Sequence, residues 1–180
     1  MHTRRKKLPL PLENIPETST IELLAPRMQT VTRQIIELRR LRFHDGRASN
    51  DEDSLTRLFE TFRTNKRQQH IYGFGRDYDD GRGIVTKAYD ASWSWHGYGL
   101  AIDIIHPKLL WNAPQDWWEQ LAKDFEFAGL RAGRRFKRMP DSPHAQWFLK
   151  GLCPISPTAQ DRADHRAGRI AEVWKRYKAA

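Results

Sequence analysis

The segment Ser94-Trp95-His96-Gly97-Tyr98-Gly99-Leu100-Ala101-Ile102-Asp103 places a histidine and an aspartate seven residues apart. From Leu100 to Ile105 every residue except Asp103 is apolar, which predicts a short strand buried on both faces. Because side chains alternate along a strand, Asp103 shares a face with Ala101, whose small side chain leaves space beside the carboxylate. His96 precedes two glycines on a loop that is able to fold over this face. An imidazole and a carboxylate in this arrangement form half of a zinc site.

A second histidine follows farther along the chain. His144 stands 41 residues after Asp103, in the segment Asp141-Ser142-Pro143-His144, and supplies a third ligand. Asp141 is a further carboxylate beside it. Spacing alone is a weak signal, because isolated histidines and aspartates are common on protein surfaces.

The combined pattern is far more specific. Ser-x-His-x-x-Gly-x-Ala-x-Asp followed by Asp-x-x-His resembles the zinc D-alanyl-D-alanine peptidase family, which includes vancomycin-resistance dipeptidases, bacterial carboxypeptidases and phage L-alanyl-D-glutamate endolysins. The resemblance extends upstream and covers roughly residues 55 to 150 in consistent order. Its further segments are Phe59–Thr64 with Gln68, Ile71–Arg76 and Gly83–Ala88.

The resemblance implies a role for each matching residue. The expected ligands of one Zn²⁺ per chain are His96, Asp103 and His144. Asp141 matches the family's general base, where many relatives carry the longer Glu, and Arg63 matches the arginine that polarises the scissile carbonyl. Ser94 and Gln68 match positions near the substrate, although both also suit ordinary hydrogen bonding in a loop and a helix.

Composition limits the classes of partner and compartment. The chain has 180 residues, 31 Lys and Arg against 22 Asp and Glu, a net charge of +9 and one cysteine, Cys153. It is long enough to bury a core without disulfides, and an intrachain disulfide is excluded. The positive charge favours an anionic partner such as the bacterial envelope. Because the sequence lacks a Gly-rich phosphate loop, we expect no nucleotide chemistry and no nucleic-acid partner.

Three regions are expected along the chain. Residues 1–19 are basic and then Pro-rich, which predicts a flexible arm; residues 20–152 form the zinc peptidase domain; and residues 153–180 form a basic amphipathic helix. The apolar stretch after the basic start is interrupted by Pro9 and Pro11, so no signal peptide is expected. We therefore expect a monomer that stays in the host cytoplasm until it is released to the cell wall.

The periodicity predicts an α+β domain with a small antiparallel sheet and helices on one side, and the resemblance implies that zinc lies at the open face. Helices are expected from near Pro26, at 65–74 and at 114–127, with a helical turn at 51–55. Strands are expected at 57–64, around Asp103 and from His144 onward. The basic run 131–138 suits either envelope contact or a solvated hairpin.

These features predict a zinc peptidase that hydrolyses a bond in peptidoglycan stem peptides, as a phage-type L-alanyl-D-glutamate endopeptidase. One alternative is a D-alanyl-D-alanine carboxypeptidase. Another, from a different class, is a basic envelope-binding protein that kept the fold without catalysis. The presence of both Asp141 and Arg63 argues against that loss.

Overall fold

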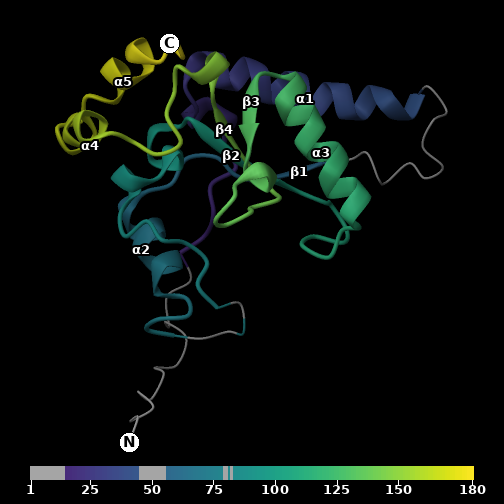
Figure 1. Cartoon of the computed structure of the whole chain (residues 1–180), viewed down its shortest axis with the longest axis horizontal. Coiled ribbons are helices and arrows are strands. Elements are labelled where there is room, and N and C mark those ends of the chain that lie inside the picture. The colour runs from purple at the N-terminus through teal and green to yellow at the C-terminus, as the bar shows by residue number, and fades with distance from the viewer. Residues whose placement is uncertain (1–14, 45–55, 79–80, 82) are drawn as a thin grey trace, which may run out of the picture.

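A computed structural model describes residues 15–44, 56–78, 81 and 83–180. Within these residues the protein is an α+β domain with helices α1 (Pro26–His44), α2 (Asn65–Gly73), α3 (Gln115–Phe127), α4 (Ala159–Arg166) and α5 (Ile170–Arg176). The strands are β1 (Arg57–Glu60), β2 (Ala101–Ile105), β3 (Leu130–Ala132) and β4 (His144–Trp147). In Figure 1 the strands lie near the centre, with α1 and α3 toward the right and α4 and α5 at the left. The predicted fold class is confirmed.

The sheet is antiparallel throughout and has the strand order β1-β2-β4-β3. Its register pairs Glu60 of β1 with Asp103 of β2, and Asp103 with His144 of β4. Residues directly opposite on antiparallel strands project from the same face. The register therefore places Glu60, Asp103 and His144 side by side on one face of the sheet, across three strands.

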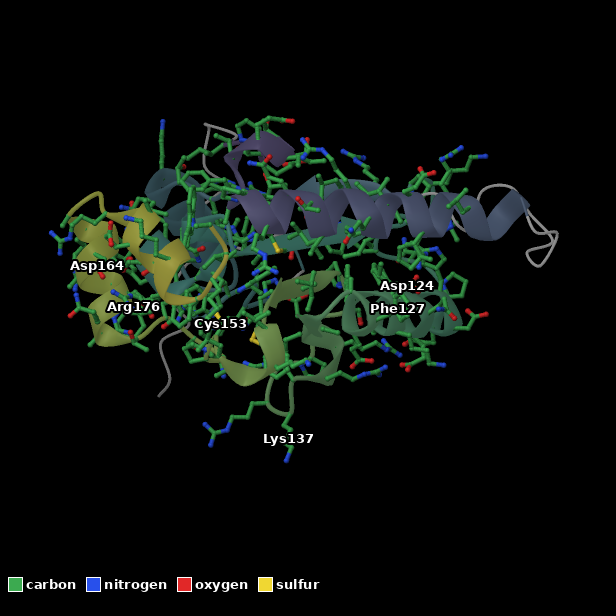
Figure 2. All side chains as sticks on the ribbon, turned by 90° about the horizontal axis from the view of Figure 1, so that it is seen from above. Asp124, Phe127, Lys137, Cys153, Asp164 and Arg176 are labelled. Atoms are coloured by element: carbon green, nitrogen blue, oxygen red, sulfur yellow. The ribbon has the colours of Figure 1, made fainter. Side chains whose placement is uncertain are left out.

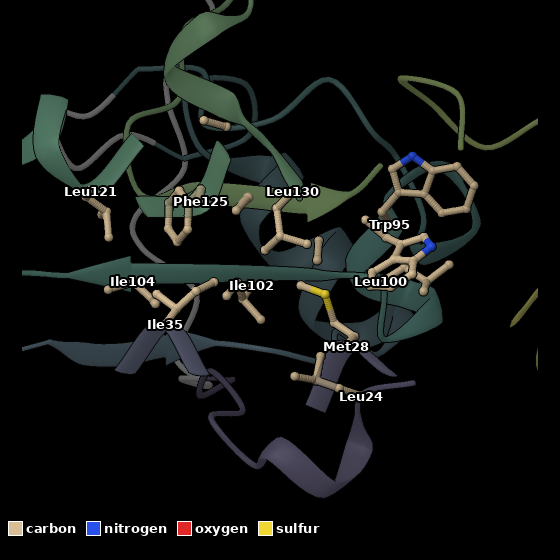
Figure 3. Close-up of a cluster of buried hydrophobic side chains, with 14 of the residues drawn as sticks. Leu24, Met28, Ile35, Trp95, Leu100, Ile102, Ile104, Leu121, Phe125 and Leu130 are labelled. Atoms are coloured by element: carbon tan, nitrogen blue, oxygen red, sulfur yellow. The ribbon is translucent and has the colours of Figure 1, made fainter. Parts of the chain in front are cut away.

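The core lies on the face of the sheet that α1 and α3 cover. Ile102 and Ile104 of β2 are fully buried in one cluster with residues of both helices (Figure 3). Strand alternation turns Asp103, which lies between them, toward the opposite face. Burial of a large aliphatic side chain contributes about 1.5–3 kcal/mol, so this cluster holds the site strand independently of any bound metal. The helix residues labelled in the cluster are Met28, Ile35, Leu121 and Phe125.

The C-terminal segment forms two helices, whereas the sequence predicted one. Gly168 adopts a left-handed backbone with φ of 70° between α4 and α5, and this ends the first helix. Arg176 of α5 then pairs with Asp161 and Asp164 of α4 (Figure 2). Since Val173 is fully buried in the main core cluster, the segment packs as part of the domain.

Two further boundaries differ from expectation. Strand β1 ends at Glu60 and not at residue 64, because the Thr61 N–H donates to the Thr18 carbonyl at 2.6 Å and so leaves the sheet. Residues 15–19, which we had assigned to the arm, lie against the domain through this bond and through Arg67 Nη1 to the Ile15 carbonyl at 2.6 Å. The rest of the expected arm and the expected turn at 51–55 lie outside the described residues.

The remaining helix predictions agree with the structure to within one residue at their starts, at Pro26, Asn65 and Gln115. None of the helices in the described part of the chain is both long and apolar enough to cross a membrane.

Candidate metal centre and cleft

Three side chains from different elements converge on one point. His96 lies in the 3₁₀ helix η3 (Trp95–Tyr98), Asp103 in β2 and His144 in β4. Asp103 Oδ1 lies 3.2 Å from His96 Nε2 and 3.0 Å from His144 Nδ1, and the two nitrogens are 3.2 Å apart. All three residues are buried. The structure thus assembles the three residues that the motif predicted.

The outer nitrogen of each histidine contacts a protein oxygen. His96 Nδ1 lies 2.8 Å from the Thr61 carbonyl, and His144 Nε2 lies 3.3 Å from Gln146 Oε1. Each outer nitrogen carries the proton if it donates to that oxygen, so the inner nitrogen presents its lone pair to the centre. Gln146 is fixed in turn, because its Nε2 donates to the Ile155 carbonyl at 3.1 Å.

The three inward atoms suit a cation. Two lone pairs and a carboxylate oxygen repel one another unless protons or a metal ion lie between them. Three ligands at about 2.0–2.2 Å from a tetrahedral zinc lie roughly 3.3–3.6 Å apart, close to the spacing found here. The residues present therefore fit a metal ion, and the group could hold one.

The pKa shifts of Asp103 and His144 also agree with a metal site. Burial favours the neutral form of Asp103, but the His96 charge and hydrogen bonds from both histidines outweigh burial and hold its pKa well below the usual range. Burial also lowers the pKa of His144, yet the hydrogen bond and charge of Asp103 raise it above its ordinary value overall. Asp103 therefore presents an ionised carboxylate to the centre, and a bound metal ion would take the place of the proton that this carboxylate favours on His144.

Two glycines allow the loops around the centre to approach closely. A Cβ at Gly97 would collide with the backbone of Ala91, which η2 (Ala91–Trp93) brings against η3. A Cβ at Gly133 would collide with the Asp141 carbonyl and with His144 Cβ. The Asp141 N–H donates to the Gly133 carbonyl at 3.0 Å, which holds the turn before β4. Each glycine thus sets the position of a loop that carries a site residue.

Arg63 lies beside the centre in a fixed orientation. Its Nε donates to Glu60 Oε2 at 2.9 Å, its Nη2 bonds the same oxygen, and its Nη1 donates to Gln68 Oε1 at 3.0 Å. Its Nη2 also lies 3.5 Å from Asp103 Oδ2. The guanidinium is therefore held against the metal centre as a fixed positive charge.

Glu60 is a site residue that the sequence reasoning missed. It is 2% exposed and binds Arg67 as well as Arg63, with Arg67 Nε 3.0 Å from Glu60 Oε1. Burial raises the pKa of Glu60, but the charge of Arg63 and then that of His96 bring it below its ordinary value. The spacing Glu60-x-x-Arg63 was visible in the sequence. Its meaning depended on the β1–β2 register, which the sequence does not display.

The two residues expected near the substrate differ in position. Ser94 lines the cleft in front of the metal centre. Gln68 is completely buried and does not line it. Gln68 Nε2 instead donates to the Ala88 carbonyl at 2.7 Å. Gln68 therefore ties Arg63 to the segment that forms one wall of the cleft, and direct substrate contact is not its role in this geometry.

Asp141 is exposed at the cleft. Desolvation by the surrounding protein, followed by the charge of Asp103, raises the pKa of its carboxyl above the ordinary value, although His144 opposes the shift. Within the described part of the chain no side chain donates a hydrogen bond to this carboxylate. A free carboxylate with a raised pKa, next to the metal centre, is suited to accept a proton.

The cleft has a volume of about 490 Å³, and His96, Asp103 and His144 are all part of its lining. Trp111, which follows β2, and Phe59 of β1 lie on one side. Trp93, which precedes β2, and Ile155 line it as well. A groove of this kind can hold substrate residues before and after a reacting bond.

Comparison with known protein families identifies the segment that carries the centre. The family described as D-alanyl-D-alanine carboxypeptidase matches residues 88–147, which include all three converging residues and Asp141. This match confirms the family resemblance found in the motif, and it supports a peptidase.

Among solved structures, the crystal structure of Serratia marcescens L-Ala D-Glu endopeptidase ChiX is similar, with a TM-score of 0.49 and 18% sequence identity. The similarity covers 72% of this chain and 84% of that chain. No curated protein sequence shows a significant match.

Proposed function

We propose that this chain, whose residues 88–147 match the D-alanyl-D-alanine carboxypeptidase family, is a zinc-dependent peptidase that cleaves the stem peptides of bacterial peptidoglycan. The observation that carries the proposal is the convergence of His96 Nε2, Asp103 Oδ1 and His144 Nδ1 within 4.8 Å of one another in the wall of a cleft. Three protein ligands and access from a cleft are the usual form of a catalytic zinc site.

The proposed chemistry divides between the metal and the chain. A zinc ion held by these residues would lower the pKa of water toward about 7 and polarise a carbonyl. Asp141 accepts the proton of the attacking water and passes it to the leaving amine, a general base and acid role supported by its unpartnered carboxylate. If the outer nitrogens of His96 and His144 donate to the Thr61 carbonyl and to Gln146 Oε1, the inner nitrogens are free to bind the zinc ion.

Arg63 stabilises the negative charge that develops on the scissile carbonyl oxygen. Its guanidinium is fixed by Glu60 and Gln68, so little reorganisation is needed as the charge forms. Since Glu60 and Asp103 are both next to it, their negative charges keep the arginine in place without a substrate. Removal of one such electrostatic donor costs roughly 10²–10³ in turnover.

We favour an endopeptidase for the L-alanyl-D-glutamate bond. Besides the three converging residues, the cleft is lined by residues of β1, of the segments before and after β2, and of 155–157, and this long lining supports binding of a peptide that continues past the scissile bond. A carboxypeptidase needs a cation for the terminal carboxylate instead. Lys87 is the observation that favours this alternative, because it is exposed at the cleft and no described residue forms an ion pair with it.

Digestion of purified peptidoglycan, followed by mass spectrometry of the new termini, tests the proposal. We expect new N-terminal D-glutamate and peptides separated from the glycan. Release of free D-alanine would instead establish the carboxypeptidase, provided that Lys87→Met abolishes this release and Lys123→Met does not. Lys123 is the matched control because it is an exposed lysine outside the cleft. Absence of any new terminus would leave the alternative of an envelope-binding protein.

A further inference from the structure

Trp93 is an exposed aromatic residue in the wall of the cleft. Its exposed fraction is 49%. The indole N–H groups of Trp95, Trp147 and Trp174 donate to backbone carbonyls at 2.7–3.1 Å. For Trp93 Nε1, by contrast, the described part of the chain provides no acceptor. A large aromatic ring that lines a cleft and has a donor open to that cleft can offer a ligand both an apolar face and a hydrogen bond.

The ring is held in place. Arg162 of α4 stacks over it, with Cζ 3.8 Å from the ring centroid, and Arg162 Nη1 donates to the Pro157 carbonyl at 2.6 Å. On the N-terminal side of Trp93, the Asp90 side chain caps η2 by accepting a hydrogen bond from the Ser92 N–H at 2.8 Å. Because the guanidinium covers one face, the exposed area of the indole belongs to its other face and its edge. The ring is therefore preorganised to stack with a flat, partly apolar group.

We propose that Trp93 is a binding platform for the N-acetylated sugar to which the stem peptide is attached. The inference rests on the proposed function and adds the glycan as part of the recognised substrate. A sugar ring has a face of C–H groups that stacks on an indole, and hydroxyl and acetamido oxygens that accept from its N–H. The side chains of a stem peptide are small or charged, and none of them matches a free indole face as well.

The position of Trp93 agrees with this occupant. Trp93 lies three residues before His96, so their Cα atoms are at most about 11 Å apart. In the substrate, one alanine and a lactyl group separate the sugar from the L-alanyl-D-glutamate bond, a length of roughly 7 Å when extended. The terminal D-alanyl-D-alanine bond is three residues farther away, roughly 11 Å more. With an extended peptide, the sugar therefore comes within reach of Trp93 when the bond near the glycan is at the metal centre, whereas cleavage of the terminal bond would require the peptide to fold back.

The test compares two substrates that differ only in the sugar, a muramyl peptide and the same peptide with an N-acetyl group. The measured quantity is the ratio of kcat/KM for the two substrates. For the wild type we expect about three- to tenfold preference for the muramyl peptide, the range that one aromatic stacking contact supplies. Trp93→Ala should reduce the ratio to about one, and Trp93→Phe should keep part of it.

Trp111→Ala is the matched control, because Trp111 lines the same cleft and is also 49% exposed. This variant should keep the wild-type ratio. A wild-type ratio near one, or a preference that survives Trp93→Ala and is lost in Trp111→Ala, would overturn the proposal. If neither peptide is cleaved, the proposed function fails. Calorimetric titration of the zinc-loaded protein with both peptides then still tests the platform: a muramyl preference that requires Trp93 supports it, and equal affinity refutes it.

Discussion

Glu60→Gln tests the electrostatic support of the metal centre. Glu60 binds Arg63 and Arg67, whose side chains are only 9% and 12% exposed. Loss of the carboxylate charge leaves two nearly buried guanidinium groups without their main counter-ion. Removal of one partner of a buried ion pair costs about 3–5 kcal/mol, and because glutamine keeps one acceptor oxygen we expect about 3 kcal/mol.

The substitution should also slow catalysis. The single acceptor oxygen of glutamine cannot serve both Arg63 and Arg67 as the carboxylate does, so Arg63 would be held less firmly, and we expect turnover of a soluble stem peptide to fall by roughly 10²-fold. Zinc content should stay the same, because Glu60 is not one of the three converging residues. Urea unfolding measures the stability change, and steady-state kinetics with saturating zinc measures the turnover change.

The control is Glu22→Gln, which removes an exposed ion pair with Arg33 whose side chains are 69% and 51% exposed. Such a pair contributes about 0–1 kcal/mol, so stability and turnover should be close to those of the wild type. If Glu60→Gln unfolds at the wild-type urea concentration and turns over normally, the supporting role that we assign to Glu60 is wrong.

Three further substitutions test other parts of the account. Asp141→Asn should keep the fold and the bound zinc but lower turnover roughly 10²–10⁴-fold, as expected for loss of a general base. Asp77→Asn, at an exposed aspartate, should leave turnover unchanged. Near-normal turnover of Asp141→Asn would remove Asp141 from this role. Gln146→Leu should weaken zinc binding roughly 10–100-fold in a competition titration, because His144 loses its outer partner; unchanged affinity would refute that link. Hydrogen bonds from Arg176 and Arg169 lower the pKa of Asp164 to about 2. Its contribution to folding stability is therefore complete above the unfolded-state pKa of about 3.9 and is lost as pH falls toward 2. Acid unfolding below about pH 4 should therefore become less steep in Asp164→Asn, and an unchanged acid transition would exclude Asp164.

The sequence predicted the centre of the fold because the signals there are local. The apolar run around Asp103 and the glycines after His96 define a buried strand and a tight loop, whatever the rest of the chain does. The helix starts at 26, 65 and 115 likewise follow from local periodicity, and Pro26 suits a first turn. These features depend on neighbours within a few residues.

Features that depend on distant contacts or on side-chain conformation were not predicted. Glu60 joins the site because β1 pairs it with Asp103. Gln146 lies on the same strand face as His144, but the contact between its oxygen and the His144 ring depends on the side-chain conformations. Gln68 matched a substrate position in the motif, yet burial assigns it to the support of Arg63. The sequence of residues 153–180 predicted one amphipathic helix, whereas the left-handed backbone of Gly168 divides this segment into α4 and α5.

Two of the five basic residues in the run 131–138 form ion pairs with described residues. Arg134 and Arg135 pair with Glu119 of α3, at 3.1 and 2.6 Å. Lys137 and Arg138 are exposed and have no ion pair with a described residue. The pairing supports an ordinary solvated surface at Arg134 and Arg135, whereas Lys137 and Arg138 remain available for contact with an anionic envelope.

The central claim is that His96, Asp103 and His144 hold one zinc ion that peptide hydrolysis requires. Its most direct test is stepwise addition of zinc to chelator-treated protein, with bound zinc and hydrolysis of a stem peptide measured in the same samples. We predict that activity rises in proportion to bound zinc and reaches its maximum at one ion per chain, and that His144→Ala shows neither uptake nor activity at the same zinc concentrations. Full activity in the zinc-free protein, or one tightly bound zinc in His144→Ala, would contradict the account.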